Sequence, residues 1–387
     1  MLISQPLIML KQRPSWLVSC ETFCCLLASL FPKAFFTSVI TWSIFVLIFI
    51  CDQDYIASQY DKPVLASCIS IGGILLFFLC VYTYYKTIWV GAGSPLDFNI
   101  LKLPSIDYIS SNPYENTSIS VNNDQDDLPE QSRSFPPEPP ADHIIFHTFS
   151  QSKPYRYCNK CQVWKPDRTH HCSSSGKCIL RMDHYCPWFA TCIGFRNQKF
   201  FIQFLLYSGI YCGYLFLVSS SILYVFFANE LYGDGFLSIN LVILCILSIS
   251  FSIALGGFGL FSVYLLLNNF TTIEFQEKRW SKQGNSSFIY EFDERGKKQN
   301  LGHIYDIGYK KNWTSIMGNT WAQWLLPIGC TSNSIYEKYN NGVNFEINEE
   351  YYSKWCNNLQ LQDQLNQQLA DYKNRIRAER ETRTSNV

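Results

Sequence analysis

Residues 157–201 read YCNKCQVWKPDRTHHCSSSGKCILRMDHYCPWFATCIGFRNQKFF, and this stretch decides how the rest of the chain is interpreted. The chain has 16 cysteines and 6 histidines, of which six cysteines and three histidines lie here. Thiolate and imidazole are the preferred ligands of protein-bound zinc, and a thiolate is also a strong nucleophile. The stretch therefore predicts metal binding, thiol chemistry, or both.

The composition of the whole chain is typical of a membrane protein. Of its 387 residues, 48% are hydrophobic and only 16% are charged, whereas about a quarter of an average soluble domain is charged. The formal net charge is +0, so no global basic field favours nucleic acid, and we expect no nucleic-acid partner. The cysteines outside the central stretch are scattered and several lie in apolar runs, which favours a reducing compartment over a disulfide framework.

Four uncharged runs are long enough to cross a bilayer, since a hydrocarbon core of about 30 Å needs roughly 20 helical residues. Residues 34–51 and 64–85 precede the cysteine-rich stretch, and residues 200–227 and 236–267 follow it. The sequence therefore predicts a membrane all-α protein. Its four transmembrane helices would hold a cytosolic zinc-binding cysteine-rich domain between helices two and three.

The same pattern predicts the domain organisation. Glu21 interrupts a short apolar piece near the start, which favours an interfacial lead-in over a cleaved signal peptide. We expect a cytosolic N-terminal segment (1–33), transmembrane helices one and two (34–99), a flexible linker rich in Ser, Asn, Asp and Pro (100–152), the cysteine-rich domain (153–199), transmembrane helices three and four (200–267) and a cytosolic C-terminal region (268–387).

Basic residues predict the orientation of this membrane protein. With four spans, the lysines and arginines before helix one, those from Lys153 to Lys199 and the cluster at Lys278 all fall on one side. Lys and Arg accumulate on the cytosolic side of membrane proteins. We therefore expect both termini and the cysteine-rich domain in the cytosol.

Spacing selects one set of metal ligands within the central stretch. Cys158 and Cys161 have the C-x-x-C spacing of a zinc knuckle, and His171 and Cys178 complete a Cys₃His set. A structural zinc would replace the hydrophobic core that this short segment cannot build. His170 is expected to be exposed or hydrogen-bonded rather than to bind the metal.

A second group, Asp183, His184 and Cys186, has the residue types of an activated thiol. A histidine can take the proton of a cysteine, and an aspartate can hold the imidazole in the useful tautomer. Taken alone, such a triplet also fits a structural role or a set of zinc ligands.

The surrounding motifs resemble one family. The runs KPDRTHHC (165–172), CILRMDHYCPW (178–188) and GFRNQKFF (194–201) are similar to the cysteine-rich domain of the DHHC-type protein S-acyltransferases, the palmitoyltransferases. The likeness continues in TTIE (271–274) and NWTSIMG (312–318), and GAGSPLDF (91–98) is most similar to fungal vacuolar members.

This resemblance implies a protein S-palmitoyltransferase of the vacuolar membrane. Such an enzyme transfers a long-chain acyl group from palmitoyl-CoA, its co-substrate, to membrane-proximal cysteines of cytosolic or membrane-associated proteins, in contact with membrane lipid. The resemblance implies that Cys186 is the nucleophile that forms an acyl thioester. His184 is implied as its base or thiolate partner, Asp183 as the residue that orients His184, Thr272 as the support of Asp183, and Trp188 as the neighbour of the thioester.

The sequence departs from the family at a second zinc site. That site maps onto Cys172, Ser175, Tyr185 and Cys192, where Ser175 replaces the usual cysteine and Tyr185 the usual histidine, so that the signature is Asp-His-Tyr-Cys. Neither replacement is a normal zinc ligand. We therefore expect one structural zinc per chain. A catalytically silent membrane adaptor is the alternative that these losses suggest, and a cross-braced ubiquitin ligase is disfavoured because it needs two complete sites.

Overall fold

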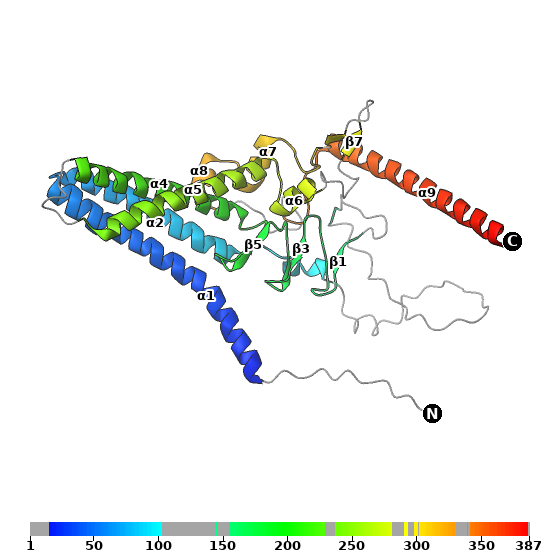
Figure 1. Ribbon diagram of the computed structural model, residues 1–387, viewed down its shortest axis with the longest axis horizontal. Coiled ribbons are helices and arrows are strands. Elements are labelled where there is room, and N and C mark those ends of the chain that lie inside the picture. The colour runs from blue at the N-terminus through cyan, green and yellow to red at the C-terminus, as the bar shows by residue number, and fades with distance from the viewer. Residues whose placement is uncertain are drawn as a thin grey trace. The chain divides into compact units, whose positions relative to one another are not determined.

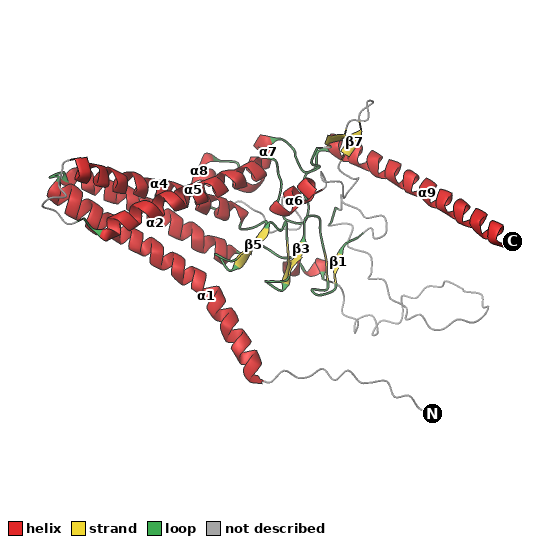
Figure 2. Ribbon diagram, viewed as in Figure 1, coloured by secondary structure: helices red, strands yellow, loops and turns green. Residues whose placement is uncertain are grey.

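The structure is a computed structural model that describes residues 15–102, 144–145, 155–228, 237–280, 290–292, 298–300, 302–329, 339 and 341–385. It is predominantly helical, with short strands only (Figure 2). The chain divides into two compact units. The helical unit comprises Met1–Trp89, Tyr185–Thr191 and Phe204–Gly257, and the cysteine-rich unit comprises Val90–His184, Cys192–Gln203 and Phe258–Val387.

Long apolar helices make up most of the helical unit and lie side by side (Figure 1). Among the described residues, four helical stretches are long and apolar enough to cross a membrane, which confirms the predicted fold class and a multi-pass membrane protein. The helices are α1 (Ser15–Phe45), its π-helical continuation η1 (Val46–Gln59), α2 (Pro63–Val90), α4 (Gln198–Ala228) and α5 (Ile239–Leu267).

The first span, Leu27–Gln59, is longer than the predicted 34–51 and continues past Asp52. Asp52 is only 1% exposed, and its carboxylate accepts a hydrogen bond from the Ser70 hydroxyl on α2. A buried carboxylate is tolerated in an apolar bundle when a polar group pairs with it. The charge that was expected to end the helix is therefore accommodated inside the helical unit.

Close packing holds these helices together. A Cβ atom added to Gly209 on α4 would lie 3.0 Å from the Gly256 Cα on α5, so position 209 needs a residue without a side chain. The Ser43 hydroxyl on α1 lies 2.9 Å from the Tyr211 hydroxyl on α4. The buried core contains residues of all these helices, among them Leu47, Cys80, Leu215 and Leu244.

The cysteine-rich stretch forms three pairs of short strands. In the antiparallel pairs Cys158 lies opposite Val163, and His171 lies opposite Cys178. Two-stranded sheets of this size are not stable alone, so another interaction must hold them. The pairs are β1 (Tyr157–Cys158) with β2 (Val163–Trp164), β3 (His170–Cys172) with β4 (Lys177–Ile179), and β5 (His184–Cys186) with β6 (Thr191–Ile193).

The cysteine-rich unit has a hydrophobic core, in which Leu180 and Phe195 of the cysteine-rich stretch pack with Tyr305 and Phe345 of the C-terminal region. Most of the linker predicted for 100–152 lies outside the described residues, but Leu101 and Ile144 at its ends are buried in this core. The remaining elements are η2 (Pro95–Asp97), η3 (Asn99–Leu101), α6 (Thr272–Trp280), β7 (Tyr290–Phe292), β8 (Lys298–Asn300), α7 (Tyr309–Met317), α8 (Trp321–Leu325) and α9 (Glu349–Ser385).

Candidate active site and metal centre

The four residues that spacing selected as metal ligands lie together in the cysteine-rich unit. The ligand atoms of Cys158, Cys161, His171 and Cys178 all lie within 4.8 Å of one another. His171 Nδ1 is 3.2 Å from Cys161 Sγ, 3.6 Å from Cys158 Sγ and 3.8 Å from Cys178 Sγ. Hairpin β1–β2 presents the C-x-x-C pair, and the facing residues of β3 and β4 present the other two ligands.

This geometry fits a tetrahedral metal ion. With Zn–S and Zn–N bonds of about 2.3 and 2.0 Å, two tetrahedral ligands lie roughly 3.6 Å apart. The three nitrogen–sulfur distances scatter around that value. The neighbouring His170 is partly buried and is not one of these ligands; burial, with the charge of Arg156, lowers its pKa to about 4.

Three of the four residues of the altered second site interact with one another in the cysteine-rich unit. Ser175 Oγ lies 3.4 Å from Cys192 Sγ, and the Cys172 thiol interacts with both. Tyr185 lies in the part of β5 that belongs to the helical unit. Within the described part of the chain, the Cys₃His set is the one cluster of three or more residues that can hold a metal.

Asp183 and His184 form a hydrogen-bonded pair. Asp183 Oδ2 lies 2.7 Å from His184 Nδ1, and the Asp183 side chain is 8% exposed. Thr272, at the start of α6, donates its backbone amide to Asp183 Oδ1 at 2.7 Å and its hydroxyl to the Asp183 carbonyl at 2.6 Å. The acidic residue is therefore fixed at both its side chain and its backbone.

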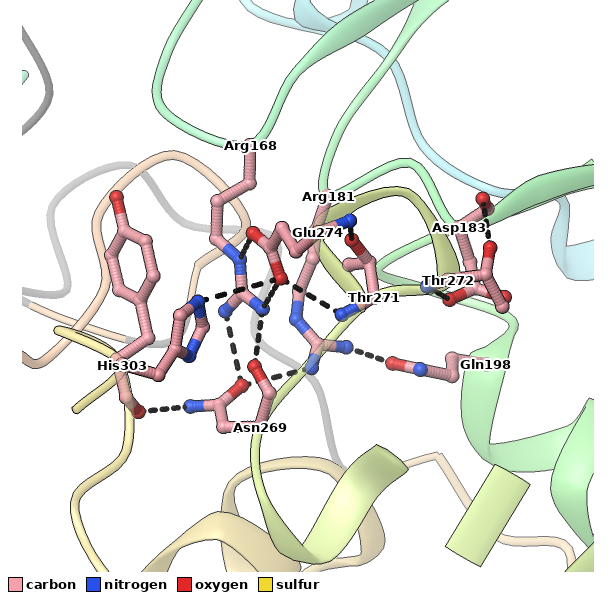
Figure 3. Close-up of polar contacts among 10 residues, drawn as sticks. Arg168, Arg181, Asp183, Gln198, Asn269, Thr271, Thr272, Glu274 and His303 are labelled. Carbon is pink, nitrogen blue, oxygen red and sulfur yellow. Dashed lines mark hydrogen bonds and ion pairs between the residues drawn. The ribbon is translucent and has the colours of Figure 1, made fainter. Parts of the chain in front are cut away.

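The TTIE run explains why Thr272 is so well placed. Thr271 and Glu274 form a capping box at the start of α6, in which the Thr271 amide donates to Glu274 Oε2 and the Glu274 amide donates to Thr271 Oγ1. Arg168 donates to both oxygens of the Glu274 carboxylate, at 2.7 and 2.8 Å (Figure 3). Burial opposes ionisation of Glu274, but the charges of Arg168 and His303 and its hydrogen bonds outweigh it and lower its pKa to about 2.

Cys186 and Trp188 lie in the helical unit. Cys186 is 8% exposed, whereas the Trp188 side chain is 61% exposed. The Tyr84 hydroxyl on α2 donates to the Trp188 carbonyl at 2.8 Å. Phe189 is 2% exposed, and its ring centroid lies 4.7 Å from that of Tyr84 and 5.1 Å from that of Phe204. The segment that contains Cys186 is thus packed against aromatic side chains of the apolar helices.

Sequence reasoning missed Tyr84, which holds the segment that contains Cys186 in the helical unit. It also missed three residues of the cysteine-rich unit that hydrogen-bond with one another, Arg168, Arg181 and Asn269. Arg168 and Arg181 were counted only as basic residues, yet they are 5% and 1% exposed. Burial, with the charge of Arg168, lowers the pKa of Arg181 to about 9. The one signal in the sequence for Asn269 was its place in the pair Asn268–Asn269, directly after an uncharged run. Asn often ends a helix in a left-handed conformation.

Comparison with known proteins gives the family. A family model described as DHHC palmitoyltransferase matches residues 151–279. Palmitoyltransferase PFA3 of Debaryomyces hansenii is 51% identical, over 98% of this chain and 98% of the relative. The same-named protein of Candida albicans is 50% identical over 94% of this chain and 95% of its own, and that of Saccharomyces cerevisiae is 32% identical over 88% and 91%. The chain belongs to the DHHC palmitoyltransferase family.

Proposed function

We propose that Cys186 is the nucleophile of this protein S-palmitoyltransferase. The main support is that the segment Tyr185–Thr191 belongs to the helical unit, where Phe189 and Tyr84 pack it against the apolar helices. A long acyl chain gains about 0.8 kcal/mol for each buried methylene, so it favours a nucleophile beside apolar helices. The exposed Trp188 is then the neighbour of the acyl thioester.

His184 and Asp183 prepare this nucleophile. Side chains alternate along a strand, so His184 and Cys186 leave strand β5 on the same face, with Tyr185 on the other. The hydrogen bond between Asp183 and His184 Nδ1 leaves Nε2 as the nitrogen that takes the thiol proton. Asp183 then acts as the orienting residue and Thr272 as its support.

The reaction proceeds in two transfers, as expected for a covalent intermediate. The Cys186 thiolate attacks the thioester carbonyl of palmitoyl-CoA, a new sulfur–carbon bond forms, and CoA leaves as a thiolate that accepts a proton. A cysteine thiolate of the protein substrate then attacks the acyl-Cys186 carbonyl. This second step breaks the bond to Cys186, which leaves as a thiolate and regains its thiol by taking up the proton that the substrate cysteine gave up.

The metal has a structural role in this proposal. Cys158, Cys161, His171 and Cys178 would hold one zinc ion, which would join hairpins β1–β2 and β3–β4 beside the small buried cluster of Cys158, Val163 and Cys178. The family's second site retains only Cys172 and Cys192 as normal ligands, so we propose a single zinc per chain. Its removal should unfold these hairpins.

The proposed location is the vacuolar membrane, with both termini and the cysteine-rich domain in the cytosol. The distribution of lysine and arginine supports the orientation, and the similarity to fungal vacuolar members supports the compartment. The protein substrates would then carry their acceptor cysteines close to the cytosolic membrane surface.

The test uses the purified full-length chain in lipid nanodiscs with an alkyne analogue of palmitoyl-CoA. We expect a label on the enzyme that hydroxylamine removes, because it cleaves thioesters. The label should be lost in Cys186→Ser and kept in Cys68→Ser, which changes an exposed cysteine on α2. A label of wild-type strength in Cys186→Ser would show that another residue is the nucleophile.

A further inference from the structure

Two buried arginines converge on the side chain of Asn269, in the turn between α5 and α6. Arg168 Nη1 donates to Asn269 Oδ1 at 3.0 Å, and Arg181 Nη2 donates to the same oxygen at 2.9 Å (Figure 3). Arg168 also donates through Nη2 to the Asn269 carbonyl at 2.6 Å. Burial of a guanidinium costs folding free energy unless its N–H donors are hydrogen-bonded. Both arginines therefore need the acceptor that Asn269 provides.

The residue at position 269 meets three demands at once. Its φ angle is 52°, in the left-handed region that Asn tolerates better than most residues. Its Oδ1 accepts from both arginines, while its Nδ2 donates to the Tyr305 carbonyl at 2.6 Å. Aspartate would offer the acceptor without the donor, and glycine would offer the backbone conformation without either group.

The position of this turn determines the position of Asp183. Residues 181–183 and residues 269–272 are joined at two points, by Arg181 to Asn269 and by Asp183 to Thr272. Arg181 and Asp183 are two residues apart in one segment, and Asn269 and Thr272 are three residues apart in the other. One contact therefore cannot shift without moving the other. The first contact therefore fixes the alignment in which the Thr272 amide meets Asp183 Oδ1.

We infer that Asn269 is a positioning residue for the Asp183–His184 pair and acts through Thr272. It touches neither His184 nor Cys186 in this role. Its side chain holds the α5–α6 turn against residues 181–183, so that the Asp183 carboxylate faces His184 Nδ1. This inference rests on the proposed roles of Cys186 and His184. The hydrogen bond from Asn269 Nδ2 to the Tyr305 carbonyl also attaches the C-terminal region to this turn.

The decisive variant is Asn269→Gly, because glycine keeps the left-handed turn and removes only the side chain. The measurement is the single-turnover rate of Cys186 acylation by palmitoyl-CoA between pH 5.5 and 9, on full-length protein in nanodiscs. We expect the plateau rate to fall about tenfold, as for a loss of one oriented hydrogen bond. The acidic limb of the profile should move to lower pH, because His184 loses the carboxylate that stabilises its protonated form.

A second variant controls for general destabilisation. A Cβ atom added to Gly302 would lie 2.5 Å from the Tyr351 ring, in the same unit but outside the turn. Gly302→Ala should lower the melting temperature and leave the acidic limb at its wild-type pH. If Gly302→Ala moved the limb as Asn269→Gly does, or if Asn269→Gly left both rate and limb unchanged, the inference would be wrong.

A double variant tests the route through Thr272. If Asn269 acts through Thr272, Asn269→Gly combined with Thr272→Val should be no slower than the slower single variant, whereas independent effects would multiply. Should Asn269→Gly not fold, Asn269→Asp replaces it: this variant keeps an acceptor for both arginines, so its acidic limb must not move to lower pH, and a limb moved to lower pH overturns the inference. Acylation that survives Cys186→Ser would instead refute the proposed function itself.

Discussion

The Thr272 backbone amide donates a 2.7 Å hydrogen bond to Asp183 Oδ1, across 89 residues of sequence. Thr272 is the first residue of helix α6, whereas Asp183 directly precedes strand β5. The second oxygen of Asp183 remains for His184. Each carboxylate oxygen thus has its own donor, and this division explains why an acidic residue here needs a helix start beside it.

We predict that Thr272→Val slows acylation of Cys186 by about fivefold to tenfold. Valine keeps the backbone amide but lacks the hydroxyl that donates to the Asp183 carbonyl, a loss of roughly 1 kcal/mol. Thr272→Ser, which keeps the hydroxyl, is the matched control and should remain within about twofold of wild type. Single-turnover labelling measures both rates, and equal rates for the two variants would show that the hydroxyl has no role.

Glu274 should make the cysteine-rich unit sensitive to acid. Its pKa is about 2 in the folded chain against an ordinary 4.5, so the folded state binds fewer protons. The stabilisation is therefore complete above about pH 4.5 and is lost as pH falls from 4.5 towards 2. Glu274→Gln should lower the stability at neutral pH by about 3 kcal/mol, because Arg168 is left buried without its carboxylate.

Thermal unfolding of wild type and Glu274→Gln across this pH range measures the effect. The difference in melting temperature between them should be largest above pH 4.5 and shrink below it. Loss of a bound metal ion in acid would affect both proteins, so the difference isolates the carboxylate. A difference that stays constant down to pH 2 would contradict the assigned ion pair.

The metal centre leads to a prediction about stoichiometry. We expect about one zinc per wild-type chain and about none in Cys161→Ser, because a Cys₃His site loses one of four ligands. Combining Ser175→Cys with Tyr185→His restores the ligand types of the second site and should raise the content to about two. Elemental mass spectrometry of the purified proteins measures this, with Cys68→Ser as the control. Two zinc ions in the wild type would refute the single-metal proposal.

The sequence was sufficient for the four spans and for the Cys₃His set. Both are encoded locally: uncharged runs near 20 residues specify helices in a bilayer, and Cys158 and Cys161 have the C-x-x-C spacing typical of zinc sites. The short hairpins were not predicted, since strands of two or three residues have no periodicity to detect. The first span also continued past Asp52, because Ser70 on another helix pairs with that carboxylate.

The polar network around Asn269 was beyond sequence reasoning for a physical reason. Arg168 contacts Asn269 across 101 residues and Glu274 across 106, so no local pattern reports their pairing. An arginine in a sequence is indistinguishable from a solvated surface charge until its partners are known. The TTIE run could be assigned a role by resemblance, but the structure supplies the reason: a capping box that also pairs with Arg168.

The contact between helices α4 and α5 gives a last prediction. A Cβ atom on Gly209 would meet the backbone of Gly256 at 3.0 and 3.1 Å, and backbone atoms cannot move aside as a flexible side chain can. Gly209→Ala should therefore separate the two helices and lower the melting temperature of the helical unit. Gly257→Ala is the matched control, because its Cβ would have no atom within 4 Å and alanine favours a helix over glycine by about 1 kcal/mol. It should be neutral or stabilising. Thermal unfolding in nanodiscs measures both melting temperatures. A lower melting temperature for Gly257→Ala than for Gly209→Ala would show that α4 and α5 do not pack through Gly209 and Gly256.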